Sequence, residues 1–291
     1  MKLFRLSLLL VWITAILLAA SGCMDNSAPD FSGDQALRYA TQVMAFGPRL
    51  PGSAASRGTA AFIKSELTEF GWSVNFQDFD HKGVEMRNII ARRNDSPPDV
   101  IIGAHYDTRA ISDQESDPDK RPLPVPGAND GASGTALLLE LGRALRNGPS
   151  NTWLVFFDGE DQGHINDWDW SIGAQYFADH LQLKPSAVVV VDMIGDSDLN
   201  VYKEKQSDPK LTAEIWSIAQ SSGYGAQIVD TEKYAMLDDH LPFIKQGIPA
   251  CLMIDFDYPY WHSQDDTLDK ISAGSLQIIG TTLTTWLINH Y

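Results

Sequence analysis

Apolar residues along this chain recur with two periods, one typical of helices and one typical of strands. Over residues 132–145, leucines and alanines repeat every three or four positions, which predicts a helix with a broad buried face. Residues 100–104 and 187–191 are apolar runs of mainly valine and isoleucine, which predicts strands buried on both faces of a sheet. The same criteria predict helices over residues 34–46, 53–70, 132–145, 171–181, 211–222, 241–245 and 272–289, and strands over residues 74–79, 86–92, 100–104, 152–157, 187–191, 199–202 and 250–254.

The order of these elements, with strands alternating with helices, predicts a three-layer α/β sandwich. Its central sheet is expected to be mostly parallel, with helices on both faces. Ser53 is the expected N-cap of the second helix and Gly71 its C-terminal stop. Residues 107–126 form a long polar segment with four prolines, and loops of that length are usually functional or mobile. No internal repeat or linker divides the chain, so residues 34–291 are expected to form one domain.

The first residues of the chain are typical of a targeting segment. Two basic residues precede an apolar run over residues 6–20, which is too short for a comfortable membrane span. Small residues then lead to Cys23, in a pattern that resembles a bacterial lipobox. This pattern predicts removal of residues 1–22, lipidation of Cys23 and a polar tether over residues 23–33, so that the protein is a membrane-anchored lipoprotein outside the cytoplasm. The alternative is an ordinary secretory signal with an incidental cysteine.

The net charge of the chain restricts the classes of molecule that it is expected to bind. The formal net charge is −16, and removal of the segment with Lys2 and Arg5 makes it −18. Such a charge argues against nucleic acid and anionic headgroups as partners. It is compatible with cationic substrates, such as peptides with a free amino terminus. Only Cys251 remains if Cys23 is lipidated, so an intrachain disulfide is not expected.

Acidic and histidine residues follow several of the predicted strands at the point where each strand ends. These motifs are His105-Tyr106-Asp107, Gly127-Ala128-Asn129-Asp130-Gly131, Glu160-Asp161, Asp192-Met193-Ile194-Gly195, Asp238-Asp239-His240 and Trp261-His262. In an open α/β sheet, sites are built where loops leave the carboxyl ends of the strands. Zinc readily takes a ligand set of imidazole nitrogens and carboxylate oxygens. The pattern therefore indicates a metal site at this edge of the sheet.

Each of these residues also has a structural explanation. Asp130 directly precedes a predicted helix and suits an N-cap as well as a metal ligand. Two neighbouring acids such as Glu160 and Asp161 usually lie solvated in a loop. His105 ends an apolar strand, where a histidine bonded to the backbone is the ordinary outcome. A carboxylate such as Asp192 at the end of a very apolar strand is costly unless it is bonded or binds a metal.

Taken in order, the motifs resemble those of the zinc-dependent M28-type peptidase family, which contains bacterial aminopeptidases and animal-type glutaminyl-peptide cyclotransferases. The resemblance runs from about Gly47 to the C-terminus. It implies that Asp130, Asp161 and His262 bind a zinc ion and that Glu160 is the general acid and base. Asp161 departs from the family pattern, because a second glutamate usually stands there. This ligand is therefore one methylene shorter than usual.

Two branches of the family match different residues. His105 and Asp192 match the ligands that complete a second metal site in the two-zinc aminopeptidases. Asp238 instead favours the cyclotransferases, since the peptidases more often carry a small polar residue at that position. In the cyclotransferase branch, the resemblance implies that Asp192 and Asp238 share a hydrogen-bond network with the catalytic Glu160.

Tryptophans also favour the cyclotransferases. Trp261 directly precedes the last of the implied ligands, and Trp168 and Trp170 follow the acidic pair. The resemblance implies that these side chains line the substrate pocket, although tryptophans can equally be core residues. Residues 48–53 are similar to a cyclotransferase stretch, whereas residues 267–269 are more similar to the peptidases.

We therefore expect a zinc-dependent glutaminyl-peptide cyclotransferase that converts an N-terminal glutamine to pyroglutamate and releases ammonia. One zinc ion, or two, and peptides or proteins with a free N-terminus are the implied cofactor and partners. The second hypothesis is a two-zinc aminopeptidase that removes N-terminal residues. The third is a catalytically silent binding lipoprotein, which the intact Glu160 argues against. The sequence leaves the peptide preference and the oligomeric state open.

Overall fold

The computed structural model describes residues 30–149 and 151–291. The predicted signal segment 1–22, the predicted lipidation site Cys23 and most of the predicted tether lie outside these residues. Within the described ranges, no helix combines the length and apolar character needed to cross a membrane.

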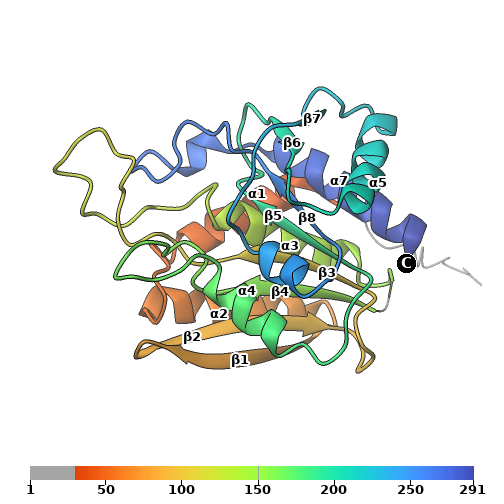
Figure 1. Cartoon of the computed structure of the whole chain (residues 1–291), viewed down its shortest axis with the longest axis horizontal. Helices are drawn as coiled ribbons and strands as arrows, with labels where there is room; N and C mark the ends of the chain where they lie inside the picture. Colours follow the sequence, from red (N-terminus) through yellow and green to blue (C-terminus); the bar gives the residue numbers. More distant parts are fainter. Residues whose placement is uncertain (1–29, 150) are drawn as a thin grey trace, which may run out of the picture.

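The central layer of the molecule is a six-stranded sheet. The strands of the described residues are β1 (Ser73–His81), β2 (Val84–Arg92), β3 (Val100–His105), β4 (Thr152–Phe157), β5 (Ala187–Asp192), β6 (Val201–Lys203), β7 (Ile228–Glu232) and β8 (Ala250–Ile254). The sheet has the order β1-β2-β4-β3-β5-β8 (Figure 1). β2 runs antiparallel to both of its neighbours, and β3, β4, β5 and β8 are parallel. The sheet is therefore mostly parallel, as predicted.

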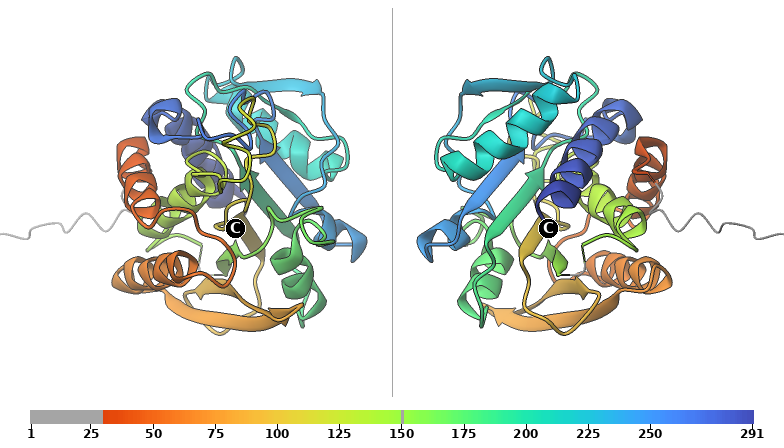
Figure 2. Two further views of the ribbon diagram at one scale, coloured as in Figure 1. Left: turned by 90° about the vertical axis from the view of Figure 1, so that its left-hand side faces the viewer. Right: turned by 90° about the vertical axis from the view of Figure 1, so that its right-hand side faces the viewer.

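Helices cover both faces of this sheet. The helices of the described residues are α1 (Gly33–Met44), α2 (Ala54–Glu69), α3 (Ala132–Ala144), α4 (Ile172–Asp179), α5 (Pro209–Ser221), α6 (Leu241–Lys245), the 3-10 helix η1 (Leu268–Lys270) and α7 (Ala273–His290). α1, α2, α3, α5 and α7 share one hydrophobic cluster with the sheet, whereas α4 and α6 share another (Figure 2). The three-layer α/β sandwich predicted from the sequence is confirmed.

The apolar runs form the centre of the sheet because both of its faces are buried. Along β5, Val189 and Val191 belong to the cluster with the larger group of helices, and Val188 and Val190 to the cluster with α4 and α6. Successive side chains of a strand point to opposite faces, so a strand between two layers of helices needs apolar residues at every position. The core strands could be read from the sequence for this reason.

Local signals predicted the helix ends to within two residues, and both ends of α2 to within one. The Ser53 side chain accepts a hydrogen bond from the Ser56 amide at the start of α2. Gly71 follows that helix at φ +86°, a backbone conformation that favours glycine. β7 was not predicted, because Asp230, Thr231 and Glu232 are exposed polar residues in a strand that pairs only with β6.

The predicted tether is wrong at its C-terminal end. Phe31 is buried in the core, where its ring fills the space above Gly280 of α7. The Ser32 side chain caps α1 by accepting a hydrogen bond from the Gln35 amide at 3.3 Å. The folded domain therefore begins at Phe31 or earlier and not at Asp34, because an aromatic side chain in the core secures the chain just before the first helix.

Candidate metal centre and active site

Five of the predicted site residues form two groups at the carboxyl edge of the sheet. In the first group, His262 Nε2 lies 2.9 Å from Asp161 Oδ1 and 3.7 Å from Asp130 Oδ2. In the second, His105 Nε2 lies 3.2 Å from Asp130 Oδ1 and 2.9 Å from Asp192 Oδ1. In each group of three, one possible ligand atom per residue lies within 4.8 Å of the others, and all members are buried. Asp130 belongs to both groups.

The first group has the chemistry of a zinc site. It offers one imidazole nitrogen and two carboxylates, a ligand set that zinc accepts. Within the described residues, neither side-chain oxygen of Asp161 makes a hydrogen bond of good geometry: His262 Nε2 lies 2.9 Å from Oδ1 but is poorly aligned with it, and the residue is only 1% exposed. Burial and the charge of Asp130 raise the pKa of Asp161 to about 7. A buried carboxylate left in this way is costly unless a cation neutralises it, so these residues fit a zinc ion.

In the second group, two of the possible ligands form a hydrogen bond with each other. His105 Nε2 and Asp192 Oδ1 form a hydrogen bond with each other at 2.9 Å. Burial raises the pKa of Asp192, and the neighbouring His105 opposes that rise. Both groups therefore contain a histidine nitrogen 2.9 Å from a carboxylate oxygen, but only the contact between His105 and Asp192 has the geometry of a hydrogen bond.

The N-cap alternative for Asp130 is wrong. The N-cap position of α3 is Gly131, which has no side chain to donate or accept there. The backbone before α3 is instead secured by Asp266, whose carboxylate accepts hydrogen bonds from the amides of Asn129 at 2.8 Å and Asp130 at 3.2 Å. Tyr258 Oη donates to the same carboxylate at 2.7 Å. The Asp130 side chain is thus free to face the two histidines.

The orientation of His262 depends on residues that the sequence did not single out. Its Nδ1 lies 3.0 Å from Asp113 Oδ1. Arg109 donates two hydrogen bonds to the other oxygen of Asp113, at 2.6 and 3.1 Å, and a third to the backbone carbonyl of Asp161 at 3.2 Å. The same guanidinium lies 5.0 Å from the ring of Trp170. One buried arginine therefore links two candidate ligands and a pocket wall, and such partners fix the orientation of metal-binding histidines.

These contacts set the charge of His262 in the metal-free protein. Burial alone would lower the pKa of His262, but the charge of Asp161 and the hydrogen bond to Asp113 raise it to about 9. Hydrogen bonds from His262 and Arg109 outweigh the burial of Asp113 and hold the pKa of that carboxyl well below its usual range. A metal ion must therefore displace a proton from His262 at neutral pH.

The acidic pair is positioned by Asp107 and Ser171. The Asp107 carboxylate accepts hydrogen bonds from the amide of Glu160 at 3.0 Å and from the amide of Asp161 at 3.3 Å. Ser171 Oγ donates to Glu160 Oε1 at 3.3 Å. Asp107 therefore fixes the backbone of the pair. The solvated-loop alternative for Glu160 and Asp161 is wrong, because both are buried.

Glu160 shares its surroundings with a third acid, Asp238. Burial, followed by the charge of Asp238, raises the pKa of Glu160 well above its usual range. Burial and the charge of Asp192 raise the pKa of Asp238 in the same direction. Crowded carboxyl groups cannot all ionise, so burial and mutual repulsion favour the protonated forms of these acids.

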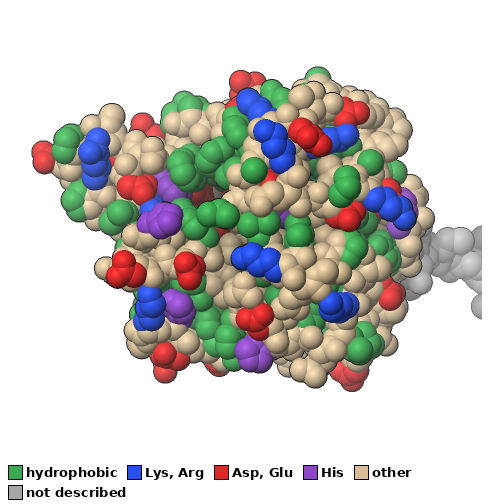
Figure 3. Space-filling model, in the orientation of Figure 1, with side chains coloured by type: hydrophobic (Ala, Val, Ile, Leu, Met, Phe, Trp, Pro, Cys, Tyr) green, Lys and Arg blue, Asp and Glu red, His purple; other side chains and the backbone are tan. Residues whose placement is uncertain are grey.

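These groups line a cavity of about 190 Å³. The lining residues are Asp130, Glu160, Asp161, Trp170, Asp192, Met193, Met236, Leu237, Asp238, Ile254, Phe256, Trp261 and His262. Figure 3 shows hydrophobic side chains gathered around a recess on this face, near the loop that projects from the molecule. Drug-sized ligands usually occupy about 300–1,000 Å³, so this cavity suits a single small side chain.

Two of the three predicted tryptophans belong to this cavity. Trp170 and Trp261 line it, and the Trp261 ring stacks on His262 with the centroids 3.7 Å apart. Trp168 lies outside it and packs against the small cluster of Phe79, Met86 and Ile172. The prediction that Trp168 lines the substrate pocket is wrong, because the turn after the acidic pair directs Trp168 toward β1 and β2.

The sequence did not identify Arg109 and Asp113 as residues of the site. Both lie on the loop over residues 107–126. Its length and prolines indicated function, but the sequence did not show which of its polar residues reach the site. Arg109 and Asp113 are close together in this loop, and Asp113 contacts a histidine 149 positions away. A pair of opposite charges four residues apart in a long loop is the signal that could have identified them.

Known proteins resemble this chain in sequence and in structure. The sequence model of Peptidase family M28 matches residues 88–287. Aminopeptidase YwaD of Bacillus subtilis is 29% identical over 212 residues, which cover 66% of this chain and 41% of that protein. Glutaminyl cyclase of Porphyromonas gingivalis has a TM-score of 0.85 at 31% identity, with 90% of this chain and 100% of that one covered. A Zn-dependent exopeptidase from Parabacteroides distasonis has a TM-score of 0.84 at 31% identity, with 91% and 100% covered.

Proposed function

This chain belongs to peptidase family M28, and we propose that it is a zinc-dependent glutaminyl-peptide cyclotransferase. It would convert an N-terminal glutamine to pyroglutamate and release ammonia. The observation that carries the proposal is the pairing of Glu160 with Asp238 in a small cavity walled by Trp170 and Trp261. The similarity to a bacterial glutaminyl cyclase over 90% of the chain supports it.

The chemistry needs a group that moves a proton between two nitrogens of the substrate. A bond forms between the α-nitrogen and the side-chain carbonyl carbon, the amide C–N bond breaks, and ammonia leaves. Glu160 would take the proton of the α-amine and donate it to the leaving nitrogen. Burial and the charge of Asp238 raise its pKa, which favours retention of the proton that it would take from the amine. Asp238 would tune that pKa through its charge, and Asp192 would in turn raise the pKa of Asp238.

We propose one zinc ion, held by Asp130, Asp161 and His262. When bound, it would supply Lewis-acid polarisation of the side-chain amide carbonyl. Asp161 supports this position, because within the described residues neither of its oxygens makes a well-aligned hydrogen bond, although Oδ1 lies 2.9 Å from His262 Nε2. His105 and Asp192 already bond each other. Trp170 and Trp261 would hold the glutamine side chain, so that amine and amide are kept in a geometry suited to attack.

A two-zinc aminopeptidase is the second candidate. The observation in its favour is the second group of possible ligands, His105, Asp130 and Asp192, which shares Asp130 with the first. The similarity to a Bacillus aminopeptidase supports it as well. In that enzyme, Glu160 would activate a water molecule and not the amine of the substrate. The hydrogen bond between His105 and Asp192 makes this the weaker proposal.

Product analysis and metal content test both candidates. The purified protein is incubated with a glutaminyl peptide and with a peptide of the same length that begins with leucine. A cyclotransferase yields a product lighter by one ammonia from the first peptide and leaves the second intact. Release of free leucine with no cyclisation would replace the proposal by the aminopeptidase. Metal analysis beside the His262→Ala variant tests the zinc site, and equal zinc in both proteins would remove His262 from it.

We also propose that the mature chain begins at lipidated Cys23 and is anchored to a bacterial membrane outside the cytoplasm. The lipobox-like residues 18–23 are the support for this proposal. Mass spectrometry of the natural protein would detect the lipid on Cys23. An unmodified N-terminus downstream of Cys23 would contradict it.

A further inference from the structure

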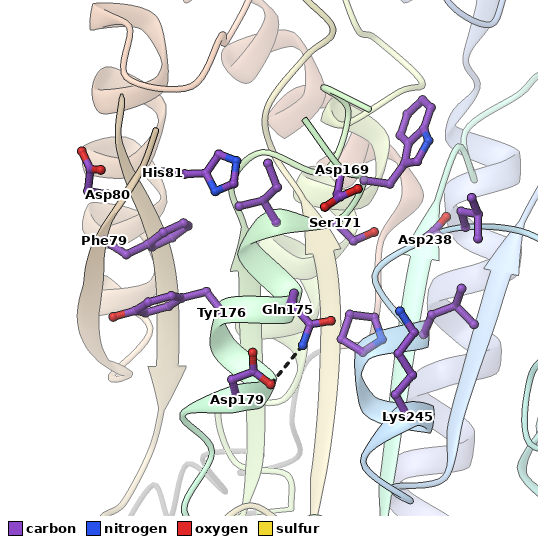
Figure 4. Close-up of a pocket in the computed structure, with 15 residues that line it drawn as sticks. Phe79, Asp80, His81, Asp169, Ser171, Gln175, Tyr176, Asp179, Asp238 and Lys245 are labelled. Atoms are coloured by element: carbon purple, nitrogen blue, oxygen red, sulfur yellow. Dashed lines mark hydrogen bonds between the residues drawn. The ribbon is translucent and has the colours of Figure 1, made fainter. Parts of the chain in front are cut away.

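A larger cavity of about 480 Å³ adjoins the proposed active site. Its walls come from the end of β1, from α4 and from α6 (Figure 4). Trp170, Leu237 and Asp238 line this cavity and the 190 Å³ cavity alike. The two cavities are therefore neighbours on either side of these residues, and we call the larger one the outer groove.

The outer groove has an apolar floor and is too large for one side chain to fill. Phe79 of β1 and Tyr176 of α4 stack with their ring centroids 4.4 Å apart. Leu241 and Pro242 line the opposite wall. The groove has more than twice the volume of the cavity beside the candidate ligands. It is therefore suited to a short run of residues with aliphatic parts.

Carboxylates dominate the charge of the outer groove. Asp80, Asp169 and Asp179 are exposed and lie around it in Figure 4. Among the described residues that line the groove, Lys245 is the only lysine or arginine. Burial lowers the pKa of His81, so this side chain adds little positive charge at neutral pH. An apolar floor with acidic edges matches the long basic side chains, whose stems pack on apolar surface while their charged ends stay in water.

We propose that the outer groove binds the residues that follow the N-terminal residue of the substrate and prefers basic side chains there. The inference rests on the proposed function, because it assumes that the first residue enters the 190 Å³ cavity. The peptide must leave that cavity on the side open to solvent. Because the outer groove shares Trp170, Leu237 and Asp238 with that cavity, it is the neighbouring surface that the next residues of the peptide would reach.

Peptide binding tests the groove independently of the reaction. The Glu160→Gln variant blocks turnover under either proposed chemistry, so calorimetry with it reports binding alone. Peptides of the form Gln-Xaa-Xaa-Ala amide carry lysine, alanine or glutamate at both Xaa positions. We expect the lysine peptide to bind about three- to tenfold more tightly than the glutamate peptide, the size expected for a few solvent-exposed charge pairs. The ratio should shrink at high salt, because salt screens exposed charges.

Two triple variants distinguish the groove from the overall charge of the protein. In the Glu160→Gln background, the groove variant replaces Asp80, Asp169 and Asp179 by asparagine. The control changes Glu69→Gln, Asp95→Asn and Glu232→Gln, which removes the same charge at exposed residues outside the groove. The groove variant should bring the ratio of affinities close to one, whereas the control should keep it. A ratio within twofold of one before mutation, or an equal loss in both variants, would overturn the inference.

Failure of the proposed function gives a different result. Glutaminamide has no residues to place in the outer groove, so the protein with Glu160 intact should cyclise it at the same rate in the groove variant and the control. If glutaminamide and all three peptides stay uncyclised, the proposed function fails, and the binding ratios still decide the groove. If glutaminamide is cyclised but the binding ratios are equal, the proposed function stands and the inference about the groove fails.

Discussion

The contact between Asp113 and His262 gives a prediction that can be worked out from the structure. Replacing Asp113 by asparagine removes the charge that accepts from His262 Nδ1 at 3.0 Å and from Arg109 at 2.6 Å. Removing such a partner of a metal-binding histidine typically costs about 10- to 100-fold in metal affinity, or about 1.4–2.7 kcal/mol. We expect a loss of that size in the zinc affinity of Asp113→Asn at about pH 9.

A second effect of the same mutation acts in the opposite direction at lower pH. Asp113 helps to raise the pKa of His262 to about 9, so a proton competes with zinc in the natural protein below that pH. Without Asp113 this pKa falls, and the competition begins only at a lower pH. The zinc affinity of the natural protein should therefore exceed that of the variant by the largest factor at about pH 9 and by a smaller factor at about pH 6.

Competition with a chromophoric chelator at several pH values measures both effects. Circular dichroism of each protein controls for folding, because Arg109 also loses its ion pair with Asp113. Asp119→Asn is the matched control, since Asp119 is an exposed residue of the same loop that does not line either cavity. Equal affinities of natural protein and Asp113→Asn at about pH 9, or a ratio that does not change with pH, would refute the reasoning.

Three further predictions concern the acids of the site. Asp238→Asn should lower glutamine cyclisation by about 10²-fold, the scale of impaired proton transfer, with zinc retained by metal analysis; unchanged cyclisation would exclude Asp238 from the chemistry. Asp161→Glu should keep the metal and alter the rate, because neither oxygen of Asp161 makes a well-aligned hydrogen bond in the described part of the chain; loss of folding by circular dichroism would show that Asp161 is packed structurally. Burial and Asp130 raise the pKa of Asp161 from 3.8 to about 7, and Asp161 and Asp113 raise that of His262 from 6.5 to about 9 against the effect of burial. Both groups bind protons more tightly in the folded state, so the stability they contribute is lost as pH rises through these values. The Tm of the metal-free protein should therefore fall between about pH 5 and about pH 9, and more steeply than that of the zinc-loaded protein, in thermal unfolding; equal slopes would argue against protons and zinc competing for this site.

The helices and strands could be predicted from the sequence, because each is determined mainly by residues a few positions apart. The runs 100–104 and 187–191 became β3 and β5, because a strand between two layers of helices requires apolar residues on both faces. Ser53 and Gly71 marked the ends of α2 through hydrogen bonding and backbone conformation within one turn. The acidic and histidine motifs could be recognised in the same way, because several of them directly follow a predicted strand. A parallel sheet brings such ends to one edge, so the candidate ligands could be listed before their distances were known.

The rest of the site was decided by contacts between distant parts of the chain. Asp113 and His262 are 149 positions apart, and their contact depends on the path of a loop without periodic sequence. The sequence could not separate Trp168 from Trp170, because a single turn directs one to a core cluster and the other to the cavity. From the sequence, Asp130 suited an N-cap and a metal ligand equally. The structure shows that Gly131 is the N-cap of α3. Side chains of the same type acquire different roles because tertiary packing decides which of them are buried together, and sequence spacing alone does not contain that information.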